Sequence, residues 1–254
     1  MPLPWQTGKV IRIENATALT RRFWIEFDSG EPFHFVPGQF VTLDLPIHEK
    51  PAKRWRSYSI ASWPDGSAIF ELVIVLLEGG AGTKFLFEEI QIGSSLTFRG
   101  PLGSFILPTP LEKDIFLICT GTGIAPFRSM VHHILNHNLV HQNIYLIFGC
   151  RRLGDALYQK EMEELELNLT GFQYLPVFSR EVPENREHLI RTGYVHAVFE
   201  EICKRNKNFI TPGQENNYLP FFYLCGWKVM IDEAKKRIVD LGFDRKSIHL
   251  ELYG

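Results

Sequence analysis

The clearest candidate for chemistry in this sequence is a glycine-containing segment near its middle, Thr120-Gly121-Thr122-Gly123, which is followed by Pro126. The segment comes after an apolar run and opens a helical pattern. Glycine lets the backbone turn tightly and approach a phosphate, and the start of a helix presents free N–H groups to it. Pro126 suits a first helical turn because its missing N–H is not needed there. We predict that the segment binds phosphate; a plain strand–helix turn is the alternative.

A second candidate site follows from the geometry of parallel sheets. Ligands bind beyond the carboxyl ends of the strands, at the point where the strand order reverses. With a strand order of 3-2-1-4-5, the glycine segment follows strand one and Cys225-Gly226 follows strand four. The two segments would then flank one crevice. A cysteine at such an edge can also be a small buried hydrophobe.

Arginines after the next two strands bear on the choice of nucleotide. Arg151 and Arg152 follow strand two, and Ser179-Arg180 follows strand three. An acid near the ribose selects NAD, whereas an arginine accommodates a 2′-phosphate because its planar fork donates two hydrogen bonds at once. These residues favour NADPH over NADH; solvated loop arginines are the alternative.

A further group of residues lies in the first half of the chain. In the run Arg56-Ser57-Tyr58-Ser59, strand alternation puts the first and third residues on one face and the second and fourth on the other. A tyrosine can stack on a flat ring and a serine can hydrogen-bond a ring nitrogen, although both are ordinary strand residues. The glycine-rich turn at 79–83 precedes a short helix and is a second candidate anion site. Two such sites suggest two nucleotides, or one nucleotide and a flavin.

Short strand patterns bounded by Gly, Pro and Asp position this second group. They predict a six-stranded antiparallel β-barrel. The strands are expected at 9–13, 22–27, 40–45, 56–61, 69–77 and 95–98, with a short helix at 83–89.

From about residue 114 the pattern changes to alternating strands and helices. Five strands with four helices imply a doubly wound, parallel, five-stranded α/β sheet. The strands are expected at 114–119, 143–149, 172–179, 221–225 and 247–252, and the helices at 126–136, 155–167, 194–206 and 228–241. A Pro-rich connector predicts two domains, 1–108 and 109–254, and the polar stretch 211–220 is expected to be a surface loop.

Composition and charge limit the class of protein. The 254 residues are 45% hydrophobic and 22% charged, which is typical of a soluble globular protein of one large or two ordinary domains. The net charge of −2 argues against nucleic-acid binding, and the apolar runs are too short to cross a membrane. Four widely spaced cysteines argue against an iron–sulfur or structural zinc site within the chain. The N-terminal residues show no secretory signal, so we expect a cytoplasmic protein.

Taken together, these residues resemble the motifs of bacterial-type flavoproteins of the ferredoxin–NADP⁺ reductase family. The resemblance covers almost the whole chain, with the motifs in the correct order. The motifs are Arg56-Ser57-Tyr58-Ser59, Gly82-Thr83, Gly100 to Phe105, Thr120 to Pro126, Ser179-Arg180-Glu181 with Tyr194, Cys225-Gly226 and Glu251-Leu252-Tyr253. Each motif alone is weak, but seven in register are specific.

The resemblance implies that the barrel binds FAD and that the α/β domain binds NADPH. In the barrel, Arg56 would meet the flavin diphosphate, which Gly82-Thr83 would cap. Tyr58 would pack on the isoalloxazine, and Ser59 would approach its N5 region.

The resemblance also implies roles for residues of the α/β domain. Ser179-Arg180 would grip the 2′-phosphate, and Tyr194 would stack on the adenine. Cys225 would align the nicotinamide, and Glu251 would assist proton and hydride movement together with the serine at N5. Tyr253 would occupy the place of the nicotinamide until it is displaced.

The function implied by the resemblance is an FAD-dependent oxidoreductase that moves electrons between NADPH and a separate carrier such as ferredoxin or flavodoxin. Hydride would pass between nicotinamide C4 and flavin N5. A basic cluster beside the flavin motif could steer an acidic carrier, a solvated basic loop being the alternative. The cluster consists of Lys50, Lys53, Arg54 and Arg56, although Arg56 should be internal if it binds the diphosphate. Two other functions stay open: an NAD(P)H-dependent reductase component of an oxygenase or other multicomponent system, and a non-catalytic flavin- or nucleotide-binding module.

Overall fold

The computed structural model describes residues 3–181, 191–206, 209 and 219–253. The chain forms two compact units: unit 1 is Met1–Leu107 with Ala125–His133, and unit 2 is Pro108–Ile124 with Ile134–Gly254. The domain boundary at residue 108 stays a prediction. Most of the surface loop expected at 211–220 lies outside the described residues.

Unit 1 contains a six-stranded antiparallel sheet, which confirms the predicted barrel class. Its elements are β1 (Gln6–Thr17), β2 (Thr20–Phe27), β3 (Phe40–Asp44), η1 (Pro51–Lys53), β4 (Trp55–Ser59), β5 (Ile69–Val75), α1 (Ala81–Glu88) and β6 (Ser95–Leu102). The strand order is β4-β3-β6-β1-β2-β5. An antiparallel bridge between Ile60, just beyond β4, and Leu72 of β5 joins the two edges of this sheet. The strand that carries the Arg56–Ser59 motif therefore ends where the sheet closes.

Phenylalanine rings fill the interior of unit 1. Phe98 is fully buried and meets three other rings edge to face, with centroid distances of 5.1 Å to Phe70, 5.7 Å to Phe33 and 6.0 Å to Phe27. Alternating strand residues point to opposite faces, so each strand contributes apolar side chains to this interior. The packed rings thus join β6 to β2, to β5 and to the segment around Phe33.

Unit 2 contains a parallel sheet with helices. The elements from residue 115 onward are β7 (Ile115–Thr120), η2 (Gly121–Gly123), α2 (Ile124–Asn136), β8 (Ile144–Cys150), η3 (Leu153–Asp155), α3 (Gln159–Asn168), β9 (Phe172–Phe178), β10 (Arg191–Thr192), α4 (Val195–Arg205), β11 (Phe221–Trp227), α5 (Lys228–Asp240), η5 (Arg245–Ser247) and β12 (Ile248–Tyr253). The sheet order is β10-β9-β8-β7-β11-β12. Its five longer strands follow the predicted order 3-2-1-4-5, which confirms the doubly wound fold.

Two differences from the predicted elements have local causes. The sheet has a sixth strand, β10, because Arg191 and Thr192 pair with the end of β9, and two residues are too few to produce a periodic pattern. The helix expected at 155–167 is divided, because Tyr158 adopts a left-handed φ of 56° between η3 and α3.

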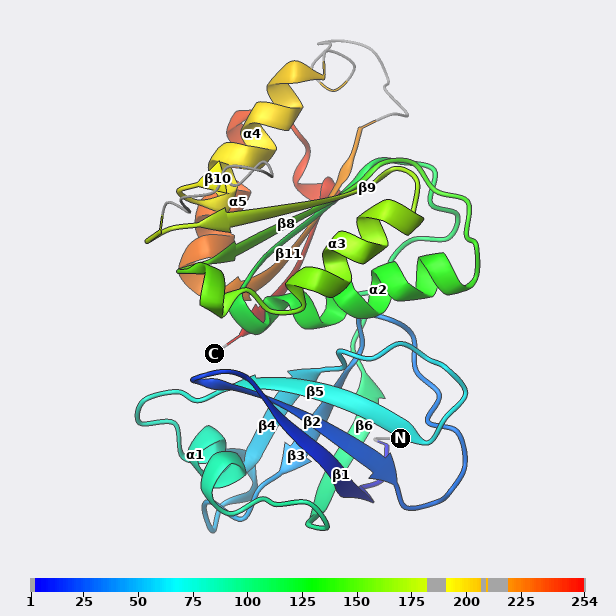
Figure 1. Ribbon diagram of the computed structural model, residues 1–254, viewed down its shortest axis with the longest axis vertical. Helices are drawn as coiled ribbons and strands as arrows, with labels where there is room; N and C mark the ends of the chain where they lie inside the picture. Colours follow the sequence, from blue (N-terminus) through cyan, green and yellow to red (C-terminus); the bar gives the residue numbers. More distant parts are fainter. Residues whose placement is uncertain (1–2, 182–190, 207–208, 210–218, 254) are drawn as a thin grey trace. The chain divides into compact units, whose positions relative to one another are not determined.

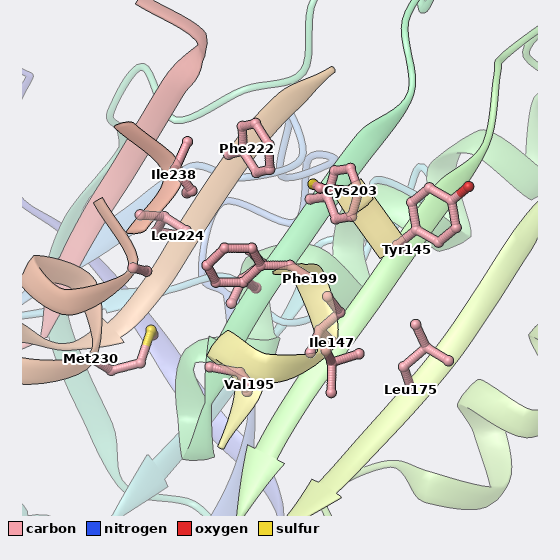
Figure 2. Packing of buried hydrophobic residues seen from close by; sticks show 14 of the residues in the cluster. Tyr145, Ile147, Leu175, Val195, Phe199, Cys203, Phe222, Leu224, Met230 and Ile238 are labelled. Atoms are coloured by element: carbon pink, nitrogen blue, oxygen red, sulfur yellow. The ribbon is translucent and has the colours of Figure 1, made fainter. Parts of the chain in front are cut away.

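A continuous apolar core attaches α4 and α5 to one face of this sheet, while α3 lies on the other face (Figure 1). Phe199 and Met230 come from the two helices and pack with Ile147, Phe222 and Leu224 of the strands (Figure 2). Burying one such side chain contributes about 1.5–3 kcal/mol. This core therefore fixes the strands whose carboxyl ends carry the predicted nucleotide residues. Among the described helices, none is long and apolar enough to cross a membrane.

We predict that Phe98→Ala lowers the free energy of unfolding of unit 1 by about 3–5 kcal/mol, because it leaves a cavity among the three rings. Ile92→Ala, at a position 64% exposed in the same unit, is the control and should cost under about 0.5 kcal/mol. Amide hydrogen exchange of β1 and β6 measures both changes. Equal exchange in the two variants would contradict the central place given to the phenylalanine rings.

Candidate functional site

The predicted glycine segment packs directly against the end of the neighbouring strand. β7 and β11 pair in parallel, with Cys119 opposite Cys225. A Cβ added at Gly123 would lie 2.3 Å from the carbonyl oxygen of Cys225, and one added at Gly226 would lie 2.6 Å from Oγ1 of Thr120. Larger residues would collide at both glycine positions. The structure thus brings the two predicted segments together at the carboxyl ends of adjacent strands.

The glycine segment has the features of an anion site. It forms the single turn η2 before α2, with Pro126 in the first turn of that helix and Gly121 at a left-handed φ of 54°. A Cβ placed at Gly121 would meet no described heavy atom within 4 Å, so the space beside it is open. The buried Oγ1 of Thr120 has no hydrogen-bond partner within the described part of the chain. Open space, the N–H groups of a helix start and an unpaired hydroxyl fit a phosphate group.

Cys225 is a fully buried thiol beside two other predicted site residues. It stands opposite Glu251 in the β11–β12 register. Burial, and then the charge of Glu251, raise the pKa of the Cys225 thiol well above its ordinary value, while a hydrogen bond with the Tyr253 side chain opposes them. The thiol therefore stays neutral at neutral pH and is a poor nucleophile. The structure places all three side chains at the same edge of the sheet.

The predicted arginines lie at the same edge, after the next two strands. The Arg180 N–H donates to the Arg151 carbonyl at 3.0 Å, and the Ser179 N–H donates to the Cys150 carbonyl at 3.0 Å. These bonds hold the ends of β8 and β9 side by side. The side chains of Arg151 and Arg180 are exposed, and neither pairs with a carboxylate in the described ranges.

Two acidic residues in these loops are engaged by the backbone. Asp155 accepts a hydrogen bond from the Arg152 N–H at 3.1 Å, and Glu181 accepts one from the Leu153 N–H at 2.6 Å. Carboxylates held in this way stabilise the loop that carries the arginines. The edge thus presents exposed guanidinium groups, which fit a phosphate better than a neutral ribose hydroxyl.

Tyr194 is placed next to this edge by the short strand β10. The Gly193 N–H donates to the Phe178 carbonyl at 2.9 Å, so Tyr194 emerges beside the end of β9 and is 71% exposed. An exposed ring at this point is available to a flat ligand. His196, two residues later, is buried, and its Nε2 lies 3.2 Å from the Met230 carbonyl. It belongs to the packing of α4 against α5.

In unit 1 the start of α1 lies against the predicted diphosphate arginine. A Cβ added at Gly82 would lie 3.0 Å from Cγ and 3.2 Å from Nε of Arg56. The Arg56 guanidinium donates to the carbonyls of Lys53 and Trp55 at 3.1 and 2.8 Å, which fixes its position. A guanidinium beside the N–H groups of a helix start is a site for a diphosphate.

The Thr83 hydroxyl is hydrogen-bonded within its own turn and is not free to cap a diphosphate. Its hydroxyl accepts a hydrogen bond from the Leu77 N–H at 3.1 Å and donates to the Gly80 carbonyl at 3.1 Å. It therefore shapes the glycine-rich turn, and only its backbone N–H is left for a ligand.

The remaining motif residues differ in exposure along β4. Ser57 is exposed, with its Oγ 3.0 Å from Oγ1 of Thr42, whereas Ser59 is buried although alternation puts both on one face. Ser59 precedes Ile60, which bridges to Leu72 of β5 where the sheet closes. Burial raises the pKa of Tyr58 to about 12, against the opposing charge of Arg56. Tyr58 is therefore a neutral phenol at neutral pH.

Several residues near these sites were not identified from the sequence. Trp227, 46% exposed, follows the Cys225-Gly226 pair and stands opposite Tyr253; a large aromatic residue at a strand end was the available signal. Arg128 and Glu71 form a buried pair, 57 positions apart, that no local pattern indicates. The described residues contain no cluster of three His, Cys, Asp or Glu that could hold a metal ion.

Two family models match the chain. The oxidoreductase FAD-binding domain matches residues 7–106, and the oxidoreductase NAD-binding domain matches residues 117–236. Ferredoxin–NADP reductase B of Sorangium cellulosum is 30% identical over 247 residues, covering 97% of this chain and 96% of that protein. The phenol hydroxylase P5 protein of Acinetobacter pittii is 29% identical over 249 residues, and this chain spans 64% of its length.

Solved structures show the same fold. The cytochrome P450 reductase GcoB of Amycolatopsis superposes with a TM-score of 0.80 at 26% identity, covering 99% of this chain and 70% of that chain. A ferredoxin NADP⁺ reductase of Neisseria gonorrhoeae, solved with bound FAD and NADP, superposes with a TM-score of 0.75 at 22% identity over 98% of both chains.

We predict that Gly123→Ala weakens NADP⁺ binding at least about tenfold, because relieving the collision with the Cys225 carbonyl must displace the glycine segment. Gly154→Ala is the matched control, since a Cβ there meets nothing within 4 Å in the described structure and needs no left-handed φ. Isothermal titration calorimetry with NADP⁺ measures both. Wild-type affinity in Gly123→Ala would show that this segment does not contact the nucleotide.

Proposed function

We propose that this chain, which belongs to the ferredoxin–NADP reductase-like family of FAD- and NAD(P)-binding oxidoreductases, moves electrons between NADPH and a one-electron carrier such as ferredoxin or flavodoxin. The observation that carries the proposal is the close approach of Gly123 to Cys225-Gly226, because it joins the phosphate segment to the predicted nicotinamide residues. When bound, the flavin supplies the redox chemistry, exchanging hydride with nicotinamide C4 at N5 and electrons singly with the carrier.

The residues of unit 1 would hold the FAD. Arg56 and the start of α1 at Gly82-Thr83 would bind its diphosphate, supported by their close packing. Tyr58 would lie against the isoalloxazine as a neutral ring, and Ser59 would donate a hydrogen bond toward N5. Ser57, on the same strand β4, would also contact the FAD.

The residues of unit 2 would hold the nucleotide. Thr120 to Gly123 and the first turn of α2, with Pro126, would bind the pyrophosphate. Cys225 would bound the nicotinamide with a neutral thiol, which adds no charge beside the carbon that exchanges hydride. Glu251 would assist proton movement, and Tyr253 would cover this edge until the nicotinamide displaces it.

The choice of NADPH over NADH rests on the edge formed by β8 and β9. Arg151, Ser179 and Arg180 would bind the 2′-phosphate, and Tyr194 would stack on the adenine. The exposed side chains of Arg151 and Arg180 support this choice, because a guanidinium can donate two hydrogen bonds to one phosphate.

The carrier would dock through charge. Lys50 and Lys53 are exposed and lie just before β4, whereas Arg54 is paired with Asp44 at 2.7 Å. Neither ammonium group pairs with a carboxylate among the described residues, and two such groups next to the flavin motif suit an acidic carrier. Relatives named phenol hydroxylase P5 protein and anthranilate 1,2-dioxygenase electron transfer component support the second candidate, a reductase component of an oxygenase.

The first test is the absorbance spectrum of the purified protein, reconstituted with FAD where needed. We expect oxidised-flavin bands that anaerobic NADPH bleaches much faster than NADH, and that return when an acidic [2Fe–2S] ferredoxin is added. Return with an oxygenase component but not with ferredoxin or flavodoxin would favour the second candidate. Flavin bands that neither nucleotide bleaches would favour a non-catalytic module and contradict the proposal.

We predict that Arg180→Gln lowers kcat/KM for NADPH about 10–100-fold, the cost of losing a charged hydrogen bond of about 1.5–3 kcal/mol. The value for NADH should change by less than about threefold, because NADH lacks the 2′-phosphate. Arg245→Gln is the control. Arg245 is exposed but precedes β12, so it lies at the amino ends of the parallel strands, away from the carboxyl ends that carry Arg180. Steady-state kinetics with both nucleotides decide, and an equal loss for NADPH and NADH would overturn the assignment.

A further inference from the structure

A buried arginine of α2 reaches the backbone just beyond the flavin motif. The side chains of Arg128 and Glu71 are 6% and 2% exposed. Nη1 of Arg128 donates to Oε2 of Glu71 at 2.9 Å and to the carbonyl of Ala61 at 2.8 Å. All three residues belong to unit 1, and Ala61 lies two positions after Ser59.

The segment at 60–62 is held on several sides. The Ile60 N–H donates to the Gln39 carbonyl at 3.0 Å, and the Ala61 N–H donates to the Glu71 carbonyl at 2.8 Å. The Glu71 N–H donates to Oγ of Ser62 at 3.0 Å. Most of these bonds involve neighbouring strands or turns of the barrel, whereas the bond to the Ala61 carbonyl comes from a helix 67 positions away.

Net stability is a poor explanation for this buried pair. Removing a guanidinium from water costs much of what the ion pair returns, so such pairs contribute little to stability on balance. Moreover, Glu71 has a second cation: Nε and Nη2 of Arg22 donate to its two oxygens at 2.6 and 3.2 Å. The charge of Glu71 is therefore compensated without Arg128.

Aromatic rings also restrict the position of the Arg128 side chain. Its Cζ lies 5.1 Å from the centroid of the Trp63 ring, which stacks on His132 of the same helix at 3.7 Å. The ring, the carboxylate and the carbonyl together restrict the orientation of the planar guanidinium. The hydrogen bond to Ala61 is thus set by a rigid surrounding.

We propose that Arg128 is a positioning residue, which fixes the Ala61 carbonyl and thereby places the Ser59 hydroxyl and the Tyr58 ring at the flavin. This inference rests on the proposed function of the Arg56–Ser59 motif. A small displacement of such groups slows a reaction without unfolding the protein, because a shift of about 1 Å can cost about 100-fold.

The test compares Arg128→Met with Arg22→Met in the full chain with FAD. Each variant removes one of the two cations at Glu71, but Arg22→Met keeps the bond to Ala61. We expect Arg128→Met to lower the limiting rate of flavin reduction by NADPH at least about tenfold, with a change in half-saturating NADPH below about threefold. Arg22→Met should change both by less than about threefold.

Amide hydrogen exchange gives a second readout that does not depend on activity. Exchange across 59–62 should rise at least about tenfold in Arg128→Met and stay near the wild-type rate in Arg22→Met. Arg128→Lys, which keeps a charged donor, should fall between wild type and Arg128→Met in rate and in exchange. If Arg128→Met does not fold, the limiting rate and the exchange at 59–62 are compared between Arg128→Lys and Arg22→Lys instead.

Equal effects of the Arg128 and Arg22 variants on rate and exchange would overturn the inference, as would a change in thermal stability alone. Failure of the proposed function has a different signature: the wild-type flavin would not be reduced by either nucleotide. In that case the exchange at 59–62 and the absorbance maxima of bound FAD still decide whether Arg128 positions this segment.

Discussion

The approach of the Gly123 backbone to the Cys225 carbonyl is the constraint on which the nucleotide half of the molecule depends. A Cβ at position 123 would lie only 2.3 Å from the Cys225 carbonyl oxygen, so no larger residue fits there. The absence of a side chain allows β7 and β11 to pair up to Cys119 and Cys225. That register also places Glu251 opposite Cys225 through β12. Residues drawn from positions more than 100 apart in the chain therefore meet because a single glycine lets two strand ends touch.

Charge is distributed unevenly along the same edge of the sheet. At β8 and β9 the acids are bound to backbone N–H groups, which leaves the guanidinium groups of Arg151 and Arg180 for a ligand. At β11 the buried Cys225 stays a neutral thiol. Fixed positive charge strengthens phosphate binding, whereas hydride exchange benefits from surroundings that exclude water and add no unpaired charge. The carboxyl ends of the sheet supply positive charge at β8 and β9 and a neutral thiol at β11.

Much of this arrangement was predictable from the sequence, because it follows from local periodicity and the rules of parallel sheets. The order of β7, β8, β9, β11 and β12 and the meeting of the glycine segment with Cys225-Gly226 are examples. Other features depend on surroundings that a pattern does not contain. The Thr83 hydroxyl turns into its own loop, and Ser59 is buried next to the Ile60–Leu72 bridge at which the sheet closes. The two residues of β10 pair only because β9 offers a free edge.

In unit 1 the sheet closes directly after the Arg56–Ser59 motif. The motif ends at Ser59, and the next residue, Ile60, bridges to Leu72 and joins the edges of the sheet. Closure buries the Ala61 carbonyl, and a buried carbonyl without a donor costs about 1–3 kcal/mol. The donor to this carbonyl is Arg128 of α2. Arg128 thus pairs with a buried backbone carbonyl two positions after Ser59, and its bond to Glu71 restricts where that carbonyl can lie.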